Sequence, residues 1–503
     1  MTSRPTGRTV LVLLTAACAA LSGCAAANRG ASHGPPNTAP GHLGGGAPTP
    51  TDTSGYGQDG FATEVDPAVD PRSTFAMDVD TASYGYARNL INQGQRPDPR
   101  NIRPEEFVNS FREDYPQPGG NGFTVGLDGT RLPGTHHPRS DGDVRLVRVG
   151  LQTRAEDRTG RPDAALTLVI DVSGSMGDPG KLDMVKQALH TLVDQLRPTD
   201  SVAIVTFSDD ARVVRPMTRV AQRGDLHAAV DELNVQSSTN LEAGLVTGYR
   251  VAREGFRAGS TNRVILLSDG LANVGDTAAA PILTQVREAA SKQITLLGVG
   301  VGNDYGDALM EQLADKGDGY VVYLSELAQA RKVFVEQLPA ALTIRALDAK
   351  VQVTFDAHTV AGYRLIGYDD RLLADSSFRN DRVDGGEVGP GHSVTALYTV
   401  RLRPGASGTV AQAQIRWQDP AGKQPHEASD TVTVSDLGGS FTAAPPRLRV
   451  CYAAAYFAEA LRHSPYGSEV RLGDLAQIAS RAADQIEDAE VTDLAAVIRR
   501  AGD

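Results

Sequence analysis

A short polar loop follows an apolar run at residues 166–177. The segment 166-LTLVIDVSGSMG-177 begins with residues that favour a buried strand and turns polar at Asp171, Ser173 and Ser175. In a tight loop this alternating spacing lets the side chains face one ion, and the glycines between them permit the bend. Carboxylate and hydroxyl oxygens suit Mg²⁺ or Mn²⁺ better than a soft metal. The loop therefore predicts part of a divalent cation site.

Two further oxygen-bearing residues occupy comparable positions later in the chain. Asp269 ends the apolar run 265-ILLSD-269, and Thr239 lies in a polar stretch before a helical pattern, where neighbouring serines offer alternative hydroxyls. Ligands of open α/β sheets bind outside the carboxyl ends of strands, where the strand order reverses. These residues can therefore converge on one edge. The predicted metal ligands are Asp171, Ser173, Ser175, Thr239 and Asp269.

Strand-like and helical patterns alternate between residues 160 and 342. Near-continuous apolar strands alternating with amphipathic helices predict a mostly parallel sheet covered on both faces, which is a doubly wound α/β domain. The strand-like runs are 166–171, 202–207, 263–269, 294–300 and 320–324, and the clearest helical patterns are 182–196 and 241–254.

The periodicity changes on either side of this domain. Residues 61–150 contain helical spacing and proline punctuation, which predict a small N-terminal α+β unit. Alternation of apolar and polar residues over 345–440 predicts an antiparallel β module. Residues 441–503 return to helical spacing and predict a helical tail.

The first residues predict export and lipid anchoring. Residues 1–23 have a basic start and an apolar run too short for a comfortable membrane span, as in a signal peptide. The stretch 21-LSGC-24 resembles the lipobox of bacterial lipoproteins. This resemblance implies that Cys24 is diacylated and anchors the protein to the cell membrane, facing the extracytoplasmic side. Residues 24–60 are rich in Gly, Pro, Ala and Thr and predict a flexible tether.

Several other motifs favour different chemistry less well. The run 298-GVGVGNDYG-306 lacks the third glycine of a dinucleotide-binding loop. Asp78 and Asp80, in DVDTAS, allow a second metal site, although capping of a helix is the favoured interpretation. The formal net charge of −12 disfavours nucleic acid as a partner.

The oxygen-bearing residues resemble a known constellation. The motif 171-DVSGS-175, with Thr239 and Asp269, resembles the metal-ion-dependent adhesion site of von Willebrand factor type A domains. Segments 76–89, 362–371 and 384–398 resemble the N- and C-terminal regions of a family of bacterial lipoproteins built around such a domain. The resemblance implies the fold and the metal site.

The functional expectation is a surface lipoprotein that binds an acidic group of a protein partner through the ion. An enzyme, such as a metal-dependent hydrolase or phosphatase, is an alternative. Against it, the sequence places no evident general base, such as a positioned His or Lys, beside the site. A structural scaffold of the cell envelope is the other alternative.

Overall fold

The computed structural model describes residues 61–133, 143–155, 161–269, 276–302, 307–324, 333–334, 344–383, 385–420, 422–468 and 470–502. The predicted signal peptide, the tether and Cys24 lie outside these residues. No helix in the described ranges is long and apolar enough to cross a membrane.

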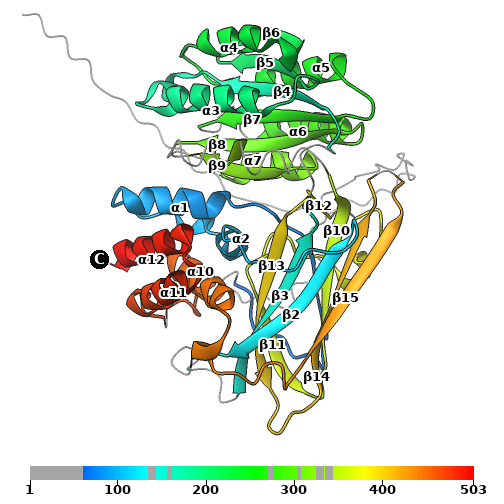
Figure 1. Ribbon diagram of the computed structural model, residues 1–503, viewed down its shortest axis with the longest axis vertical. Helices are drawn as coiled ribbons and strands as arrows, with labels where there is room; N and C mark the ends of the chain where they lie inside the picture. The colour runs from blue at the N-terminus through cyan, green and yellow to red at the C-terminus, as the bar shows by residue number, and fades with distance from the viewer. Residues whose placement is uncertain are drawn as a thin grey trace, which may run out of the picture. The chain divides into compact units, whose positions relative to one another are not determined.

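The predicted doubly wound α/β domain is confirmed, with a six-stranded sheet in the order β6-β5-β4-β7-β8-β9 (Figure 1). All neighbouring strands are parallel except β5 and β6. Strands β4 and β8 are buried along their whole length, and β7 is buried after its first residue, as expected for a sheet covered on both faces. The strands are β4 (Ala164–Asp171), β5 (Ser201–Phe207), β6 (Ala211–Arg219), β7 (Thr261–Ser268), β8 (Ile294–Val301) and β9 (Tyr320–Leu324).

Helices cover both faces of this sheet. On one face, α3 buries Val185, Leu189 and Leu192 in the same cluster as Leu168 and Ile170 of β4. Their spacing along α3 is that of one helical face, which explains why this segment is an amphipathic helix. Helix α4 joins the same cluster through Leu226 and Val230. The other face carries a second cluster, formed with α5, α6 and α7. The helices are α3 (Lys181–Gln195), α4 (Arg223–Asp231), α5 (Leu241–Glu254), α6 (Asp276–Ala290) and α7 (Asp307–Lys316).

Two antiparallel sheets form a second β structure around one apolar cluster (Figure 1). The Phe355 ring stacks on Tyr363 with centroids 4.1 Å apart, which joins the two sheets. One sheet contains β1 (Arg72–Ala76), β10 (Ala346–Phe355), β14 (Thr409–Gln418) and β15 (Pro425–Thr433), with β12 (Gly386–Val388) beside β10. The other contains β11 (Val360–Ile366), β13 (Ser393–Leu402), β3 (Asp143–Thr153) and β2 (Phe123–Arg131).

These sheets differ from the predicted division into a separate N-terminal unit and a β module. Strands β1, β2 and β3 come from residues 61–153. Strand β1 pairs with β10 and β3 pairs with β13 of the module, while β2 pairs with β3 at the edge of the sheet. In β3, Val147 is fully buried and pairs with Tyr398 of β13. An apolar strand with unpaired backbone groups is unfavourable. The N-terminal strands therefore complete the sheets of the C-terminal module.

The helical tail packs with the N-terminal helices. Helix α10 is buried on nearly all sides, and its Phe457 lies 5.9 Å from Phe107 of α2, measured between ring centroids. Cys451 is free and buried within α10. The helices are α1 (Ala82–Asn92), α2 (Pro104–Asn109), α10 (Pro446–Leu461), α11 (Leu472–Ile486) and α12 (Ala489–Gly502). Short 3₁₀ turns are η1 (Pro99–Asn101), η2 (Gly174–Gly177), η3 (Val220–Gln222), η5 (Asp375–Ser377) and η6 (Phe441–Ala443).

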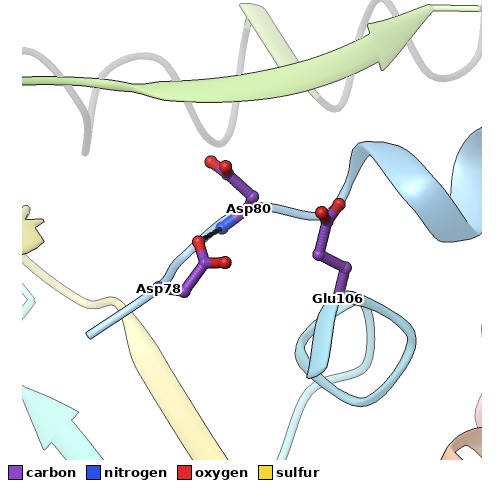
Figure 2. A group of neighbouring side chains, drawn as sticks. All are labelled: Asp78, Asp80 and Glu106. Atoms are coloured by element: carbon purple, nitrogen blue, oxygen red, sulfur yellow. Dashed lines mark hydrogen bonds between the residues drawn. The ribbon is translucent and has the colours of Figure 1, made fainter. Parts of the chain in front are cut away.

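A buried acidic cluster lies between the α/β domain and the antiparallel sheets. It consists of Asp78, Asp80 and Glu106 (Figure 2). The backbone N–H of Val321 in β9 donates to Asp80 Oδ1 at 2.8 Å, and Arg371 contacts both aspartates at 3.3 and 3.2 Å. The cluster thus ties the α/β domain to the antiparallel sheets through charge-assisted hydrogen bonds.

The helix-cap interpretation of Asp78 and Asp80 is wrong. Helix α1 begins after Thr81, which makes no side-chain cap. The backbone N–H of Ser83, in the first turn of α1, donates to Glu106 Oε2 at 2.8 Å. The carboxylate of Glu106 in α2 therefore supplies a hydrogen-bond acceptor for the N-terminal end of α1. The two aspartates are engaged by a neighbouring strand and an arginine, which sequence spacing could not indicate.

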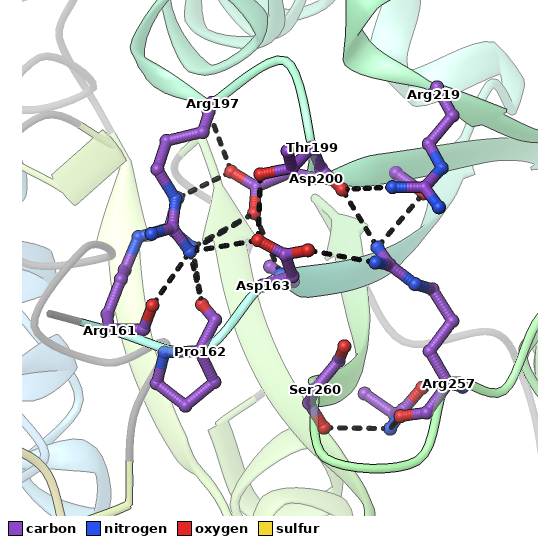
Figure 3. A network of polar contacts seen from close by, with 12 residues as sticks. Arg161, Pro162, Asp163, Arg197, Thr199, Asp200, Arg219, Arg257 and Ser260 are labelled. Carbon is purple, nitrogen blue, oxygen red and sulfur yellow. Dashed lines mark hydrogen bonds and ion pairs between the residues drawn. The ribbon is translucent and has the colours of Figure 1, made fainter. Parts of the chain in front are cut away.

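A polar network closes the amino ends of the α/β strands. Figure 3 shows Arg161, Arg197 and Arg257 around Asp163 and Asp200. Asp200 is fully buried and accepts hydrogen bonds from Arg161 and from the backbone of Arg197 at 2.7 Å. Asp163 accepts from Arg257 at 2.9 Å. A buried Asp200 and a partly buried Asp163 with several donors fix the loops at this end of the sheet.

Candidate metal centre

Asp171 occupies the carboxyl end of β4, between β5 and β7. The chain leaves β4 for β5 and later returns to β7 on the other side, so the strand order reverses here. Asp171 is fully buried, and both its carboxylate oxygens are held. The N–H of Ser173 donates to Oδ1 at 2.8 Å, and the hydroxyl of Ser268 donates to Oδ2 at 2.6 Å.

The hydroxyls of the polar loop continue from this carboxylate. Ser173 Oγ lies 3.1 Å from Ser175 Oγ, and Ser175 donates to Asp269 Oδ1 at 2.9 Å. Ser173 and Asp269 are each 1% exposed, whereas Ser175 is exposed. The 3₁₀ turn η2 (Gly174–Gly177) produces this arrangement by bending the chain directly after Ser173. The four predicted side chains Asp171, Ser173, Ser175 and Asp269 therefore lie in one cluster with an open side at Ser175.

Thr239 lies in a loop that contacts this cluster through its backbone. The N–H of Gly174 donates to the carbonyl of Ser237 at 3.2 Å, and the N–H of Gln236 donates to the carbonyl of Val172 at 2.6 Å. A side chain at Gly174 would place its Cβ 3.1 Å from that Ser237 oxygen, so glycine permits the close approach. Thr239 is half-buried, and its hydroxyl makes no hydrogen bond to the described part of the chain.

The electrostatics of the cluster fit a cation. Burial raises the pKa of Asp171, and the charge of Asp269 raises it further, against the hydrogen bonds that it accepts. Desolvation and a neighbouring like charge each disfavour the ionised carboxylate, and a bound cation would offset both effects. The donors are carboxylate and hydroxyl oxygens, the set that Mg²⁺ and Mn²⁺ prefer. The residues present therefore fit a hard divalent cation.

Lys181 also lies at this site, contrary to the expectation that no Lys or His accompanies it. Its ammonium is 2.8 Å from Asp269 Oδ2 and 3.1 Å from Asp178 Oδ2. Burial alone would lower the pKa of Lys181, but the hydrogen bonds and charges of these aspartates together outweigh it and raise the pKa. Lys181 therefore pairs with the carboxylates at the edge of the site.

Two residues of the site were missed from the sequence. Ser268 is adjacent to the predicted Asp269, but its contact with Asp171 depends on the register of β4 and β7. Lys181 is the first residue of α3, directly after the polar loop. This closeness in sequence to the predicted ligands was the signal that could have indicated a lysine at the site. Neither contact follows from spacing alone.

The acidic cluster of Asp78, Asp80 and Glu106 is the other group that could hold a metal ion within the described residues, with one oxygen of each within 4.8 Å of the others. Its carboxylates accept hydrogen bonds from protein donors: Val321, Ser83, Arg371 and the N–H of Asp80. Arg371 supplies positive charge there, so the cluster is accounted for as a structural junction.

The fold of the α/β domain corresponds to a von Willebrand factor type A domain. The family model described as "von Willebrand factor type A domain" matches residues 165–336. Two further models match the flanks: "von Willebrand factor" over 52–138 and "Uncharacterized protein YfbK, C-terminal" over 340–414.

Similarity to whole proteins extends beyond that domain. The Escherichia coli (strain K12) protein described as "Uncharacterized protein YfbK" is 31% identical over 441 residues, covering 82% of this chain and 75% of that protein. The chain belongs to the same family as this protein. "Uncharacterized protein sll0103" of Synechocystis sp. is 26% identical over 301 residues, covering 58% of this chain and 70% of that protein. The solved structure "von Willebrand factor type A from Catenulispora acidiphila" is 17% identical, covers 75% of this chain and 89% of that chain, and has a TM-score of 0.45.

Proposed function

We propose that the type A domain binds Mg²⁺ or Mn²⁺ and, through the ion, an acidic group of a protein partner. Type A domains commonly bind partners through a metal site. The observation that carries the proposal is the run of oxygen contacts from Ser173 through Ser175 to Asp269, beside the buried carboxylate of Asp171. The proposed ligands are Asp171, Ser173, Ser175, Thr239 and Asp269.

The donor set supports recognition of a carboxylate from outside. Neutral hydroxyls leave a divalent cation only partly neutralised, and Mg²⁺ usually retains open or water-filled positions. When bound, the ion supplies a positive centre that an Asp or Glu side chain can coordinate. The chain has a formal net charge of −12, so its bulk charge would repel an acidic partner. Attraction of such a partner must therefore come from the metal site.

Binding, rather than turnover, is the role we propose. Metal-assisted hydrolysis needs a group that accepts a proton from water at the ion. The amine of Lys181 is paired with the carboxylates of Asp269 and Asp178, so it is not placed to accept that proton.

Lipid attachment at Cys24 would place this activity at the membrane surface. Residues 25–60 are Gly- and Pro-rich, and a flexible chain of that length has a root-mean-square reach on the order of 30 Å. We propose that the tether holds the type A domain clear of the cell membrane on its extracytoplasmic side. With Cys24 lipidated on that side, the protein partner would also lie outside the cytoplasm.

Chemical cross-linking on intact cells tests the proposed function. The tagged protein is cross-linked in Mg²⁺ and in EDTA, and the captured proteins are compared. Ser173→Ala should reduce the magnesium-dependent species, because it removes one proposed ligand. Ser291→Ala is the matched control, since Ser291 is an exposed residue whose hydroxyl bonds the Glu288 carbonyl. Partners that persist in EDTA and with Ser173→Ala would contradict metal-dependent binding.

A further inference from the structure

Lys181 places a buried positive charge against one of the proposed metal ligands. It is the first residue of α3, and 8% of its surface is exposed. The ammonium contacts Asp269 Oδ2 at 2.8 Å, and Asp269 is itself 1% exposed. Because a buried ion pair is screened little by solvent, this contact acts strongly on the charge of the site.

The fold provides space for the lysine side chain. Gly302 directly follows β8 and has φ +81°, a left-handed conformation that favours glycine. A Cβ at Gly302 would lie 2.6 Å from Lys181 Cε, so any side chain there would displace the lysine stem. Gly302 is itself fixed, because its N–H donates to the carbonyl of Leu324 at 3.0 Å. The lysine therefore occupies a built position and not a chance surface orientation.

The two oxygens of Asp269 have different partners. Oδ1 accepts the hydroxyl of Ser175, within the run of proposed ligands, and Oδ2 accepts the ammonium of Lys181. The lysine thus holds the carboxylate from one side while the other oxygen remains among the hydroxyls. Within the described residues, the donors to Asp171 are the Ser173 N–H and the Ser268 hydroxyl, which are neutral.

We propose that Lys181 is the internal counter-cation of the metal centre: it offsets the repulsion of Asp171 and Asp269 when no ion is bound, and it lowers the affinity of the centre for divalent cations. This inference rests on the proposed metal binding. The lysine and the metal ion are like charges beside the same carboxylate, so the lysine weakens binding of the ion. A site adjusted in this way releases its ion more readily, and partner binding then follows the external magnesium concentration.

Two neutral replacements of Lys181 separate the effect of its charge from the effect of its hydrogen bond on the orientation of Asp269. Lys181→Met removes both the charge and the hydrogen bond to Asp269, whereas Lys181→Gln retains a donor without the charge. We expect magnesium affinity to rise about tenfold or more in both variants, because the removed charge acts over a few ångströms in a partly buried site. Lys186→Met is the matched control: Lys186 lies on the same helix, is solvent-accessible and bonds the Asp231 carbonyl.

Titration calorimetry with magnesium alone, together with thermal melts in EDTA, measures these effects. Without metal, Lys181→Met should melt below the wild type, and magnesium should restore more of its stability. A variant that folds only with magnesium also supports the inference. Unchanged or weaker magnesium binding by both Lys181 variants, compared with Lys186→Met, would overturn it.

The same titration distinguishes failure of the two proposals. If the wild type and both Lys181 variants bind no magnesium or manganese, the proposed metal centre itself is wrong. If the wild type binds magnesium and the variants bind it no more tightly, the centre stands and the role of Lys181 is wrong.

Discussion

The Ser268 hydroxyl donates a 2.6 Å hydrogen bond to Oδ2 of Asp171, although the two residues are 97 positions apart in the chain. The parallel register of β4 and β7 produces this contact, because Ile170 pairs with Leu267 and the next residue of each strand follows at the same edge. Ser268 therefore fixes the orientation of a buried carboxylate that is a proposed ligand.

Ser268→Ala should weaken magnesium binding without removing a ligand. Loss of a group that orients a ligand commonly lowers metal affinity about tenfold or more. Titration calorimetry with magnesium measures the change, and circular dichroism checks the fold. Ser260→Ala is the control, because Ser260 precedes the same strand at its opposite end. Equal magnesium affinity in the two variants would mean that Ser268 does not position Asp171.

Magnesium should raise the melting temperature of the protein, and Asp269→Asn should shrink the increase. A ligand that binds only the folded state at ten times its Kd adds about 1.4 kcal/mol, or about 3–6 °C for a domain of this size. Differential scanning calorimetry with and without magnesium measures both proteins. Asp183→Asn, an exposed acid on α3, controls for the lost charge. Identical shifts in wild type and Asp269→Asn would exclude Asp269 from the site.

Glu105 should make the stability of the protein depend on pH. This carboxyl is 2% exposed, and its Oε2 has no hydrogen-bond partner in the described chain. Burial, together with the charges of Asp369 and Asp78, raises its pKa from 4.5 to about 7. The unfolded chain ionises first as pH rises, so the free energy of unfolding falls across that window.

Glu105→Gln tests this dependence, because an amide cannot ionise. Between pH 5 and 8 the free energy of unfolding of the wild type should fall by on the order of 3 kcal/mol more than that of the variant. Urea unfolding at both pH values measures the difference, and Glu232→Gln, an exposed acid, is the control. The comparison of variant with wild type removes the contribution of Glu113, whose pKa burial also raises to about 7. Parallel pH profiles would contradict the assignment.

Cys24→Ala should move the protein from the membrane fraction to the soluble fraction. The described residues contain no helix suited to crossing a membrane, and acyl chains supply the binding expected at Cys24. Fractionation of cells, with immunodetection of the tagged protein, gives the measurement. Cys18→Ala is the matched control within the same segment. Retention of Cys24→Ala in washed membranes would count against this anchor.

Local sequence pattern was sufficient for the α/β domain and for much of its candidate site. Strands β4 and β7 are continuous apolar runs, and a buried parallel sheet requires that composition. Strand β6 was not predicted, because it is a half-exposed edge strand that contains Pro216 and lacks such a run. The metal-ligand roles of the five residues remain predictions.

Tertiary structure decided which remote groups act on those residues. The placement of Asp171 and Asp269 at one edge follows from strand ends and sheet order, which the sequence alone could indicate. The contact of Ser268 with Asp171 required the register of two strands, and the contact of Lys181 with Asp269 required the space left by Gly302. Such contacts depend on distances between chain segments, and these are set by packing and not by local residue pattern. The sequence therefore identified the candidate oxygen ligands, while packing decided their orientation and charge balance.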